Sequence, residues 1–319
     1  MAKHSKSREP KIKQLDFFSV LIVILVIILI ALLIIIHFKN KSEDDNLPSQ
    51  NISSNIKETT TAETSSPETD TATVDSSKEE NRFEGLTMTN ENVGVPVLYY
   101  HSVDPSEANE VIISPDKLRE ELTFIKESGY TTLTMSELND YILNNTPIPE
   151  KSIVITFDDG YADNYANAFP ILKELDMKAT IFVISNFTDN DGYYMTSQQL
   201  KEMSDYGIDI QSHTASHLHL NELSYEEQLN ELKTSKEKLE SITGKPVISV
   251  AYPFGDYNDN SVKASKDAGY SLSFTTNRGL SDREDNSLAL DRIYVSSTYN
   301  IDQFKEVLST TAKQIKDDW

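Results

Sequence analysis

The sequence predicts an α/β domain with a parallel sheet covered by helices, preceded by one transmembrane helix and a disordered linker. Strand-like apolar runs alternate with amphipathic helical segments over residues 91–319. An uncharged apolar run lies near the N-terminus, and a polar stretch joins this run to residues 91–319. The alternation fits a closed barrel and an open doubly wound sheet equally well, so this pattern alone favours neither architecture.

The apolar run near the N-terminus predicts a membrane anchor. Residues 17–36 carry no charge, and about 20 apolar residues cross a bilayer core. No A-x-A cleavage site follows the run. Five Lys/Arg residues lie within residues 1–16, whereas acidic residues occupy 43–45. The positive-inside rule therefore predicts a cytoplasmic basic tail at 1–16, a single-pass signal-anchor at 17–38 in the cell membrane, and an extracellular remainder.

The next segment, residues 39–90, predicts a disordered linker. Ser, Thr, Glu, Asp and Asn dominate it, and its apolar residues are too sparse to form a core. Its charges repel one another, so it is expected to act as a spacer that holds the following domain away from the membrane. A recognition segment is the alternative interpretation.

Composition excludes several classes of function. The 319 residues include no cysteine, so any metal must be held by His, Asp or Glu. The formal net charge is −22, and beyond residue 41 there are 22 basic and 49 acidic residues. An acidic surface of this kind repels nucleic acid. We expect no nucleic-acid partner, and we expect the domain at 91–319 to be monomeric.

Capping signals delimit the elements of this domain. Ser114 and Pro115 begin a helix with one apolar face that stops at Gly129. The helix expected over 161–175 is kinked or broken at Pro170. Three further helices, each begun by Ser, Thr or Asn and closed by Gly, are expected at 196–207, 224–245 and 258–270. The predicted strands are 95–100, 152–157, 179–184, 208–213, 246–253, 271–276 and 291–296.

Polar clusters follow several of the predicted strands. The stretch TFDDG places Asp158 and Asp159 after one strand, and SHTASH places His213 and His217 after another. PFGDYN follows a third strand, and His101 closes the first. Both candidate architectures collect the carboxyl ends of their strands at one face, where chemistry takes place. These residues are therefore expected to lie close together.

The two histidines and the paired carboxylates predict a hydrolytic metal site. Imidazoles separated by three residues can face one ion, and with one carboxylate they leave coordination positions open. Adjacent carboxylates are tolerated where a cation neutralises one of them, so one Asp can bind the metal while the other acts as general base. Gly160 permits the tight turn that this needs. Ordinary surface histidines and a simple Asx turn are the alternatives.

In this order and spacing, TFDDGYADNY, SHTASH and AYPFGDYN resemble the motifs of the polysaccharide deacetylases, the NodB-homology domains of carbohydrate esterase family 4. The resemblance covers residues 93–319 and implies a distorted (β/α)7 barrel-like fold and metal-dependent removal of acetyl groups, most often N-acetyl, from sugars. It implies that Asp158 is the base and that Asp159, His213 and His217 hold a divalent metal. Zn²⁺ is expected first, with Co²⁺, Ni²⁺ or Mn²⁺ as alternatives.

Two departures from the family pattern indicate a subgroup. Ala251 stands where most members have an Arg, and no His follows His219 to act as general acid. VPVLYYHSV and LDRIYVSSTYNIDQF instead resemble the poly-N-acetylglucosamine deacetylases of biofilm exopolysaccharide systems. This resemblance implies that His101 is the general acid, with a buried strand-end histidine as the alternative. Arg292 matches a subgroup Arg that either orients Asp158 or forms a salt bridge at the rim of the core.

The remaining expectations concern the substrate. A backbone N–H near Phe254, together with Tyr252, is expected to hold the oxyanion, and His219 to have a packing or supporting role. Trp319 either covers a sugar site or belongs to a frayed terminus. The expected substrate is a cell-wall or extracellular polysaccharide that contains N-acetylglucosamine, namely poly-N-acetylglucosamine or peptidoglycan. An O-deacetylase of acetylated sugars such as xylan and an inert glycan-binding scaffold are the alternatives.

Overall fold

The computed structural model describes residues 82–190 and 192–309. The chain divides into two units, Met1–Ser77 and Lys78–Trp319, and all the described residues belong to the second.

Several predictions fall on other parts of the chain. The basic tail at 1–16, the membrane anchor at 17–38, residues 39–81 of the linker and Trp319 all lie outside the described residues. In the part of the chain that the structure describes, no helix combines the length and the apolar character needed to cross a bilayer.

Seven parallel strands close into a barrel. The strand at each end of the series pairs with the other, because β2 hydrogen-bonds to both β12 and β7. This closure selects the barrel over the open sheet and confirms the expected (β/α)7 architecture. In ring order the strands are β2 (Val97–Tyr100), β12 (Leu290–Tyr294), β11 (Leu272–Arg278), β10 (Ser249–Ala251), β9 (Asp209–Ser212), β8 (Thr180–Val183) and β7 (Ser152–Phe157).

Shorter strands extend this barrel or lie beside it. Strand β5 (Thr131–Thr132) pairs with the start of β7, while the end of β7 pairs with β8. Strands β3 (Ser102–Val103) and β4 (Ile112–Ile113) form a separate parallel pair directly after β2.

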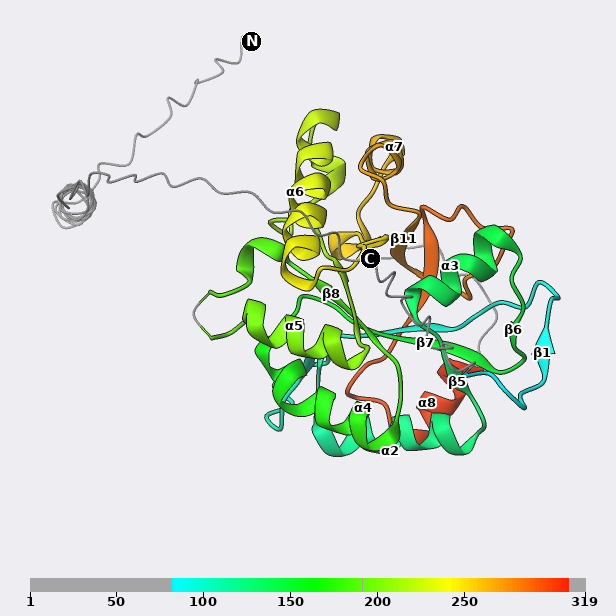
Figure 1. Ribbon diagram of the computed structural model, residues 1–319. Helices are drawn as coiled ribbons and strands as arrows, with labels where there is room; N and C mark the ends of the chain where they lie inside the picture. Colours follow the sequence, from blue (N-terminus) through cyan, green and yellow to red (C-terminus); the bar gives the residue numbers. More distant parts are fainter. Residues whose placement is uncertain (1–81, 191, 310–319) are drawn as a thin grey trace, which may run out of the picture. The chain divides into compact units, whose positions relative to one another are not determined.

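Helices surround the barrel (Figure 1). The caps expected from the sequence are present, since Ser114 accepts a hydrogen bond from the N–H of Lys117, and Gly207 and Gly244 end their helices in the left-handed conformation. The helix expected over 161–175 is divided into a π-helical segment (Asn164–Ala168) and α4. The helices are α2 (Pro115–Glu127), α3 (Met135–Asn144), α4 (Phe169–Leu175), α5 (Ser197–Tyr206), α6 (Tyr225–Thr243), α7 (Asp259–Asp267) and α8 (Ile301–Leu308).

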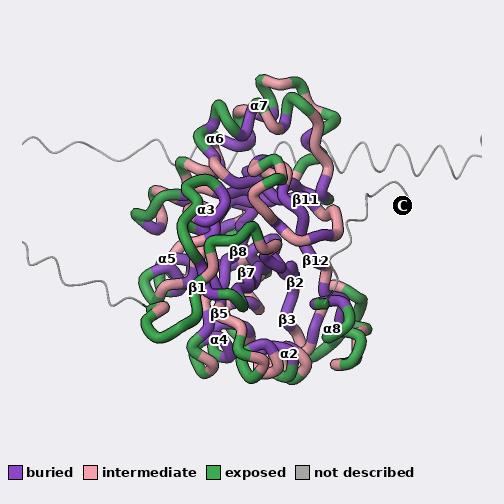
Figure 2. Tube along the Cα trace, turned by 90° about the vertical axis from the view of Figure 1, so that its right-hand side faces the viewer, coloured by how far each residue is buried: buried purple, intermediate pink, exposed green. Residues whose placement is uncertain are grey.

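Successive side chains of each barrel strand enter two different apolar layers. The layer inside the barrel also contains residues of α3, and its strand members include Val97, Val154, Phe182, Ala251, Phe274 and Leu290. The layer between barrel and helices includes Leu98, Ile155, Ile181, Val250 and Ile293. Figure 2 shows the buried residues concentrated on the strands and the exposed ones on the surrounding helices. This alternation determines which polar side chains at the strand ends point toward the barrel axis.

The folded domain begins earlier than residue 91, where the sequence analysis placed its boundary. Strand β1 (Met88–Thr89) pairs with β6 (Ile148–Pro149). Arg82 donates hydrogen bonds to both carboxylate oxygens of Glu137, at 2.6 and 2.7 Å. Residues 82–90, which were assigned to the linker, therefore belong to the domain. A strand of only two residues leaves no periodic pattern in the sequence, which is why it was missed.

A protein that starts at residue 91 is expected to unfold at a lower temperature than one that starts at residue 82. The shorter protein lacks β1, the Arg82–Glu137 pair and the carbonyl of Asn90, which accepts a hydrogen bond from Arg283 at 2.8 Å. These contacts lie near the surface, so their loss should lower the free energy of unfolding by about 1–2 kcal/mol. Thermal unfolding of both proteins measures this, and equal midpoints would show that residues 82–90 do not stabilise the domain.

Candidate active site

The predicted polar residues meet at the carboxyl ends of the barrel strands. The N–H of Asp158 donates to the carbonyl of Tyr100 at 2.9 Å, so Asp158 continues the ladder between β7 and β2. The N–H of His213 likewise donates to the carbonyl of Val183 at 2.9 Å and continues the ladder of β9. Asp158 follows the alternation of Val154, which faces inward, so its side chain also points toward the barrel axis.

Asp159 leaves β7 through a left-handed turn. The φ angles of Asp159 and Gly160 are 75° and 78°, a region that Asp tolerates better than most residues and that Gly adopts freely. A Cβ atom on residue 160 would also lie only 3.2 Å from Cγ1 of Val183. The expectation that Gly160 permits a tight turn is confirmed. The turn directs the carboxylate of Asp159 toward the two histidines.

Three ligand atoms converge at this turn. Oδ1 of Asp159 lies 3.4 Å from Nε2 of His213 and 3.3 Å from Nε2 of His217. Among the described residues these three form the group of His, Asp and Glu side chains that could hold a metal ion. Ligand atoms on a tetrahedral Zn²⁺ with bonds of about 2.0–2.1 Å lie about 3.3–3.4 Å apart. The observed spacing therefore fits one small cation.

Hydrogen bonding and charge at these ligands also fit a cation. Nδ1 of His213 donates to the carbonyl of Ala251 at 2.8 Å, which leaves the lone pair on Nε2. Within the described part of the chain, Oδ1 of Asp159 is buried and accepts no hydrogen bond, an arrangement that is costly without a compensating partner. Burial raises the pKa of Asp159, but the neighbouring imidazoles outweigh it and hold the pKa well below its usual range.

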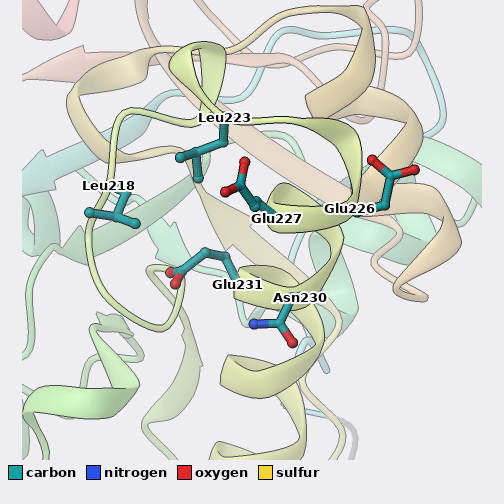
Figure 3. Close-up of a pocket in the computed structure, with 6 residues that line it drawn as sticks. All are labelled: Leu218, Leu223, Glu226, Glu227, Asn230 and Glu231. Carbon is teal, nitrogen blue, oxygen red and sulfur yellow. The ribbon is translucent and has the colours of Figure 1, made fainter.

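The loop that carries His217 is supported from two sides. The N–H of His217 donates to Oγ1 of Thr214 at 3.1 Å, and the N–H of Ser216 donates to Oε2 of Glu231 at 2.7 Å. Glu231 lies on α6 and was not predicted, because no spacing in the sequence relates it to the histidines. A pocket of about 330 Å³ lies beside this loop (Figure 3), lined by Leu218, Leu223, Glu226, Glu227, Asn230 and Glu231. None of its lining residues is a predicted site residue.

A buried arginine fixes the orientation of Asp158. Arg292, on β12, donates to Oδ1 and Oδ2 of Asp158 at 2.8 Å each and is completely buried. Its guanidinium lies over the ring of Tyr99 at 4.3 Å and donates through Nε to the carbonyl of Thr275 at 3.0 Å. This bidentate contact fixes the position of the Asp158 carboxylate, as the first of the two interpretations of Arg292 requires. Burial raises the pKa of Asp158, but Arg292 and the neighbouring imidazoles together outweigh it, so the pKa is lowered and the carboxylate is ionised.

His101 enters the site from the end of β2. Its ring packs against Tyr99 with centroids 5.9 Å apart, and its carbonyl accepts a hydrogen bond from Nδ2 of Asn164 at 2.8 Å. Burial lowers the pKa of His101 and outweighs the opposing charges of Asp158 and Asp159. Among the described residues its Nδ1 is buried and has no hydrogen-bond partner. The charges of Asp158 and Asp159 act on this ring, and in the described part of the chain its Nδ1 is not engaged by a protein group.

The prediction that Tyr252 contacts the oxyanion is wrong. Its side chain belongs to the outer layer, is completely buried, and donates its hydroxyl to the carbonyl of Leu288 at 2.9 Å. Its N–H donates to the carbonyl of Phe274 at 2.9 Å. Neither donor of Tyr252 can therefore reach a substrate at the inner face of the strand ends.

Phe254 lies against the histidines on the other side of the site. Its backbone is left-handed, with φ 59°, and its half-exposed ring lies edge-on to His217 at 4.5 Å between centroids. His219 stacks on the same ring at 4.0 Å, and its Nδ1 lies 2.6 Å from Oδ2 of Asp256. His219 thus packs beside the site. The role of the Phe254 N–H in holding an oxyanion stays a prediction.

Comparisons with known proteins agree with this geometry. The family model for polysaccharide deacetylase matches residues 145–273. The chain is 35% identical over 219 residues to YxkH of Bacillus subtilis (strain 168), assigned to the polysaccharide deacetylases by name, covering 69% of this chain and 77% of that protein. It is 27% identical over 204 residues to the poly-β-1,6-N-acetyl-D-glucosamine N-deacetylase of Staphylococcus epidermidis, covering 60% and 70% of the two chains. The structure of the Streptococcus pyogenes deacetylase PplD in complex with acetate superposes with a TM-score of 0.65 at 32% identity, covering 69% of this chain and 100% of PplD.

Proposed function

This chain belongs to the polysaccharide deacetylase family, and we propose that it is a metal-dependent N-deacetylase of N-acetylglucosamine residues in an extracellular or cell-wall polysaccharide. The observation that carries the proposal is the convergence of Asp159, His213 and His217 beside an arginine-held Asp158. The similarity to the staphylococcal enzyme supports poly-N-acetylglucosamine as substrate, with peptidoglycan as the second candidate. The apolar run at 17–36 supports attachment to the cell membrane with the domain outside.

The residues present fit a divalent cation. Asp159, His213 and His217 would hold it, and two nitrogens with one oxygen favour Zn²⁺, with Co²⁺, Ni²⁺ or Mn²⁺ as alternatives. When bound, the cation would polarise the acetyl carbonyl and make water a better nucleophile.

Asp158 and His101 then transfer the protons of the reaction. Asp158 is ionised and oriented by Arg292, so its carboxylate takes a proton from the attacking water. His101 gives a proton to the departing nitrogen as the C–N bond breaks, and a backbone N–H near Phe254 stabilises the oxyanion. Water and the amide are consumed, and acetate and a free amine are formed in equal amounts.

The test is to incubate the metal-loaded protein with poly-β-1,6-N-acetylglucosamine, peptidoglycan and acetylated xylan, and to measure acetate and free amines. Equal release of both from one of the first two substrates is the expected result. Acetate without amine from xylan would indicate an O-deacetylase instead. Release of neither product from any of the three would overturn the proposal and favour a glycan-binding scaffold.

Replacing His101 by alanine is expected to lower kcat about 10²–10⁴-fold, because a general acid contributes about that much. A donor must carry its proton, so the wild-type rate should fall as pH rises through the pKa of His101, which burial lowers. This limb of the pH–rate profile should disappear in the variant. Acetate release between pH 5 and pH 9 measures both effects.

His219→Ala is the matched control for this experiment, since His219 is half-exposed and is proposed to have no part in proton transfer. Metal content should be the same in wild type and both variants, and both variants should remain folded. Near-wild-type turnover of His101→Ala with an unchanged limb would mean that another group donates the proton.

A further inference from the structure

Three tyrosines form a packed cluster beside the Asp159 turn. Tyr161 directly follows Gly160, and Tyr193 and Tyr194 lie ahead of α5. The ring of Tyr161 stacks on Tyr194 with centroids 5.5 Å apart and meets Tyr193 edge-on at 5.2 Å. We call Tyr161, Tyr193 and Tyr194 the tyrosine platform. Of the three residues, only Tyr161 carries a signal in the sequence, because it directly follows the DDG motif.

Main-chain hydrogen bonds join the platform to the site. Tyr161 and Tyr194 form an antiparallel bridge. The N–H of Ala162 donates to the carbonyl of Tyr193 at 2.9 Å, and the N–H of Met195 donates to the carbonyl of Gly160 at 3.0 Å. Because Gly160 is the next residue after Asp159, the platform is held at a fixed position relative to the proposed metal ligands.

The platform extends from the site into solvent. Tyr161 is partly buried and follows Asp159 by two residues at the turn, so its ring forms the inner end of the platform. Tyr193 lies one ring further out and is 64% exposed, the highest value among the exposed large apolar side chains of the described residues. Single exposed apolar residues are common. Tyr193 differs because its ring belongs to a packed cluster that starts at the turn carrying Asp159.

The chemistry of the platform matches a sugar ring. A tyrosine offers a flat apolar face of negative potential and a hydroxyl at its edge. A pyranose offers a face of weakly positive C–H groups with hydroxyls around its rim, so the two surfaces stack and hydrogen-bond at their edges.

We propose that the tyrosine platform is a glycan-binding subsite, in which Tyr193 stacks on the sugar next to the one that is deacetylated. The inference rests on the proposed function, and it makes the enzyme selective for oligosaccharides over single sugars. Tyr161 lies beside Asp159 and therefore adjoins the reacting sugar. Tyr193, one ring further from Asp159, adjoins its neighbour along the chain.

Tyr193→Ala tests the subsite in the full-length protein. The variant should raise KM for a pentamer of N-acetylglucosamine about 5- to 20-fold, as expected for the loss of one aromatic stacking contact. Its kcat, and kcat/KM for the single sugar, should not change. Tyr193→Phe keeps the stacking face and should restore most of the affinity. Tyr206→Ala is the matched control, because Tyr206 is 42% exposed and ends α5 next to the amino end of β9, at the opposite end of the barrel.

Pentamer binding measured by calorimetry, with wild type and Tyr193→Ala, separates the subsite from the chemistry. Tyr193-dependent binding without any deacetylation would support the subsite and overturn the proposed function. Deacetylation with the same KM and Kd in wild type and Tyr193→Ala would overturn the subsite and leave the function standing. If the wild type self-associates and Tyr193→Ala does not, with KM unchanged, the subsite proposal would be overturned in favour of an interface between two copies of the chain.

Discussion

Replacing His217 by alanine is expected to release the cation and abolish acetate production while the barrel stays folded. A site with three protein ligands cannot lose one and keep its affinity, and we expect cation binding to weaken by more than about 100-fold. His217 is the best ligand to replace, because its side chain is 22% exposed whereas that of His213 is 3% exposed. His213 also donates to the carbonyl of Ala251, which would lose its partner in His213→Ala.

Metal content after dialysis against a weak chelator, measured beside acetate release, tests this prediction. His219→Ala changes the same residue type two positions along the chain and should keep both properties. In the wild type, a strong chelator should abolish activity, and added Zn²⁺ should restore it. If the His217→Ala protein retains stoichiometric metal, the cation is bound elsewhere and the site assignment is wrong.

The sequence identified the strand ends well because each end carries a local signal. DDG and HTASH directly follow the strand segments SIVITF and IDIQS, and a left-handed turn at Asp159–Gly160 needs the residue types found there. The caps Ser114 and Gly207 were equally visible, because a capping residue acts on backbone groups only a few positions away. Signals of this kind can be recognised without knowledge of the fold.

The direction of individual side chains was harder to predict. A strand in a parallel barrel is buried on both faces, so its sequence is apolar throughout and does not show which face points inward. Tyr252, near the end of the strand expected at 246–253, was expected to contact the oxyanion, but its side chain points outward with that of Val250. The side chain of Arg292 points toward the barrel axis and hydrogen-bonds to Asp158, which is 134 residues away in the chain. Only closure of the barrel, with β2 between β7 and β12, brings these two strands close together.

Asp158→Asn is expected to lower turnover by at least about 10²-fold while the cation is retained, since a general base contributes about 10²–10⁴. Asparagine has nearly the same volume, and its amide oxygen keeps one of the two acceptors that Arg292 uses. The second acceptor becomes a donor that faces a guanidinium N–H. We therefore also expect a thermal midpoint a few degrees lower, because a buried charge loses part of its partner.

Three measurements together define the role of Asp158. These are acetate release at saturating substrate, metal content and the thermal midpoint. Asp205→Asn is the matched control, because it makes the same chemical change in an exposed residue of α5 that pairs with Lys201, and it should leave all three unchanged. Metal loss in Asp158→Asn would make Asp158 a ligand rather than the base. Full metal content with near-wild-type turnover would place the base elsewhere and leave the Asp158–Arg292 pair as a contact that only stabilises the barrel.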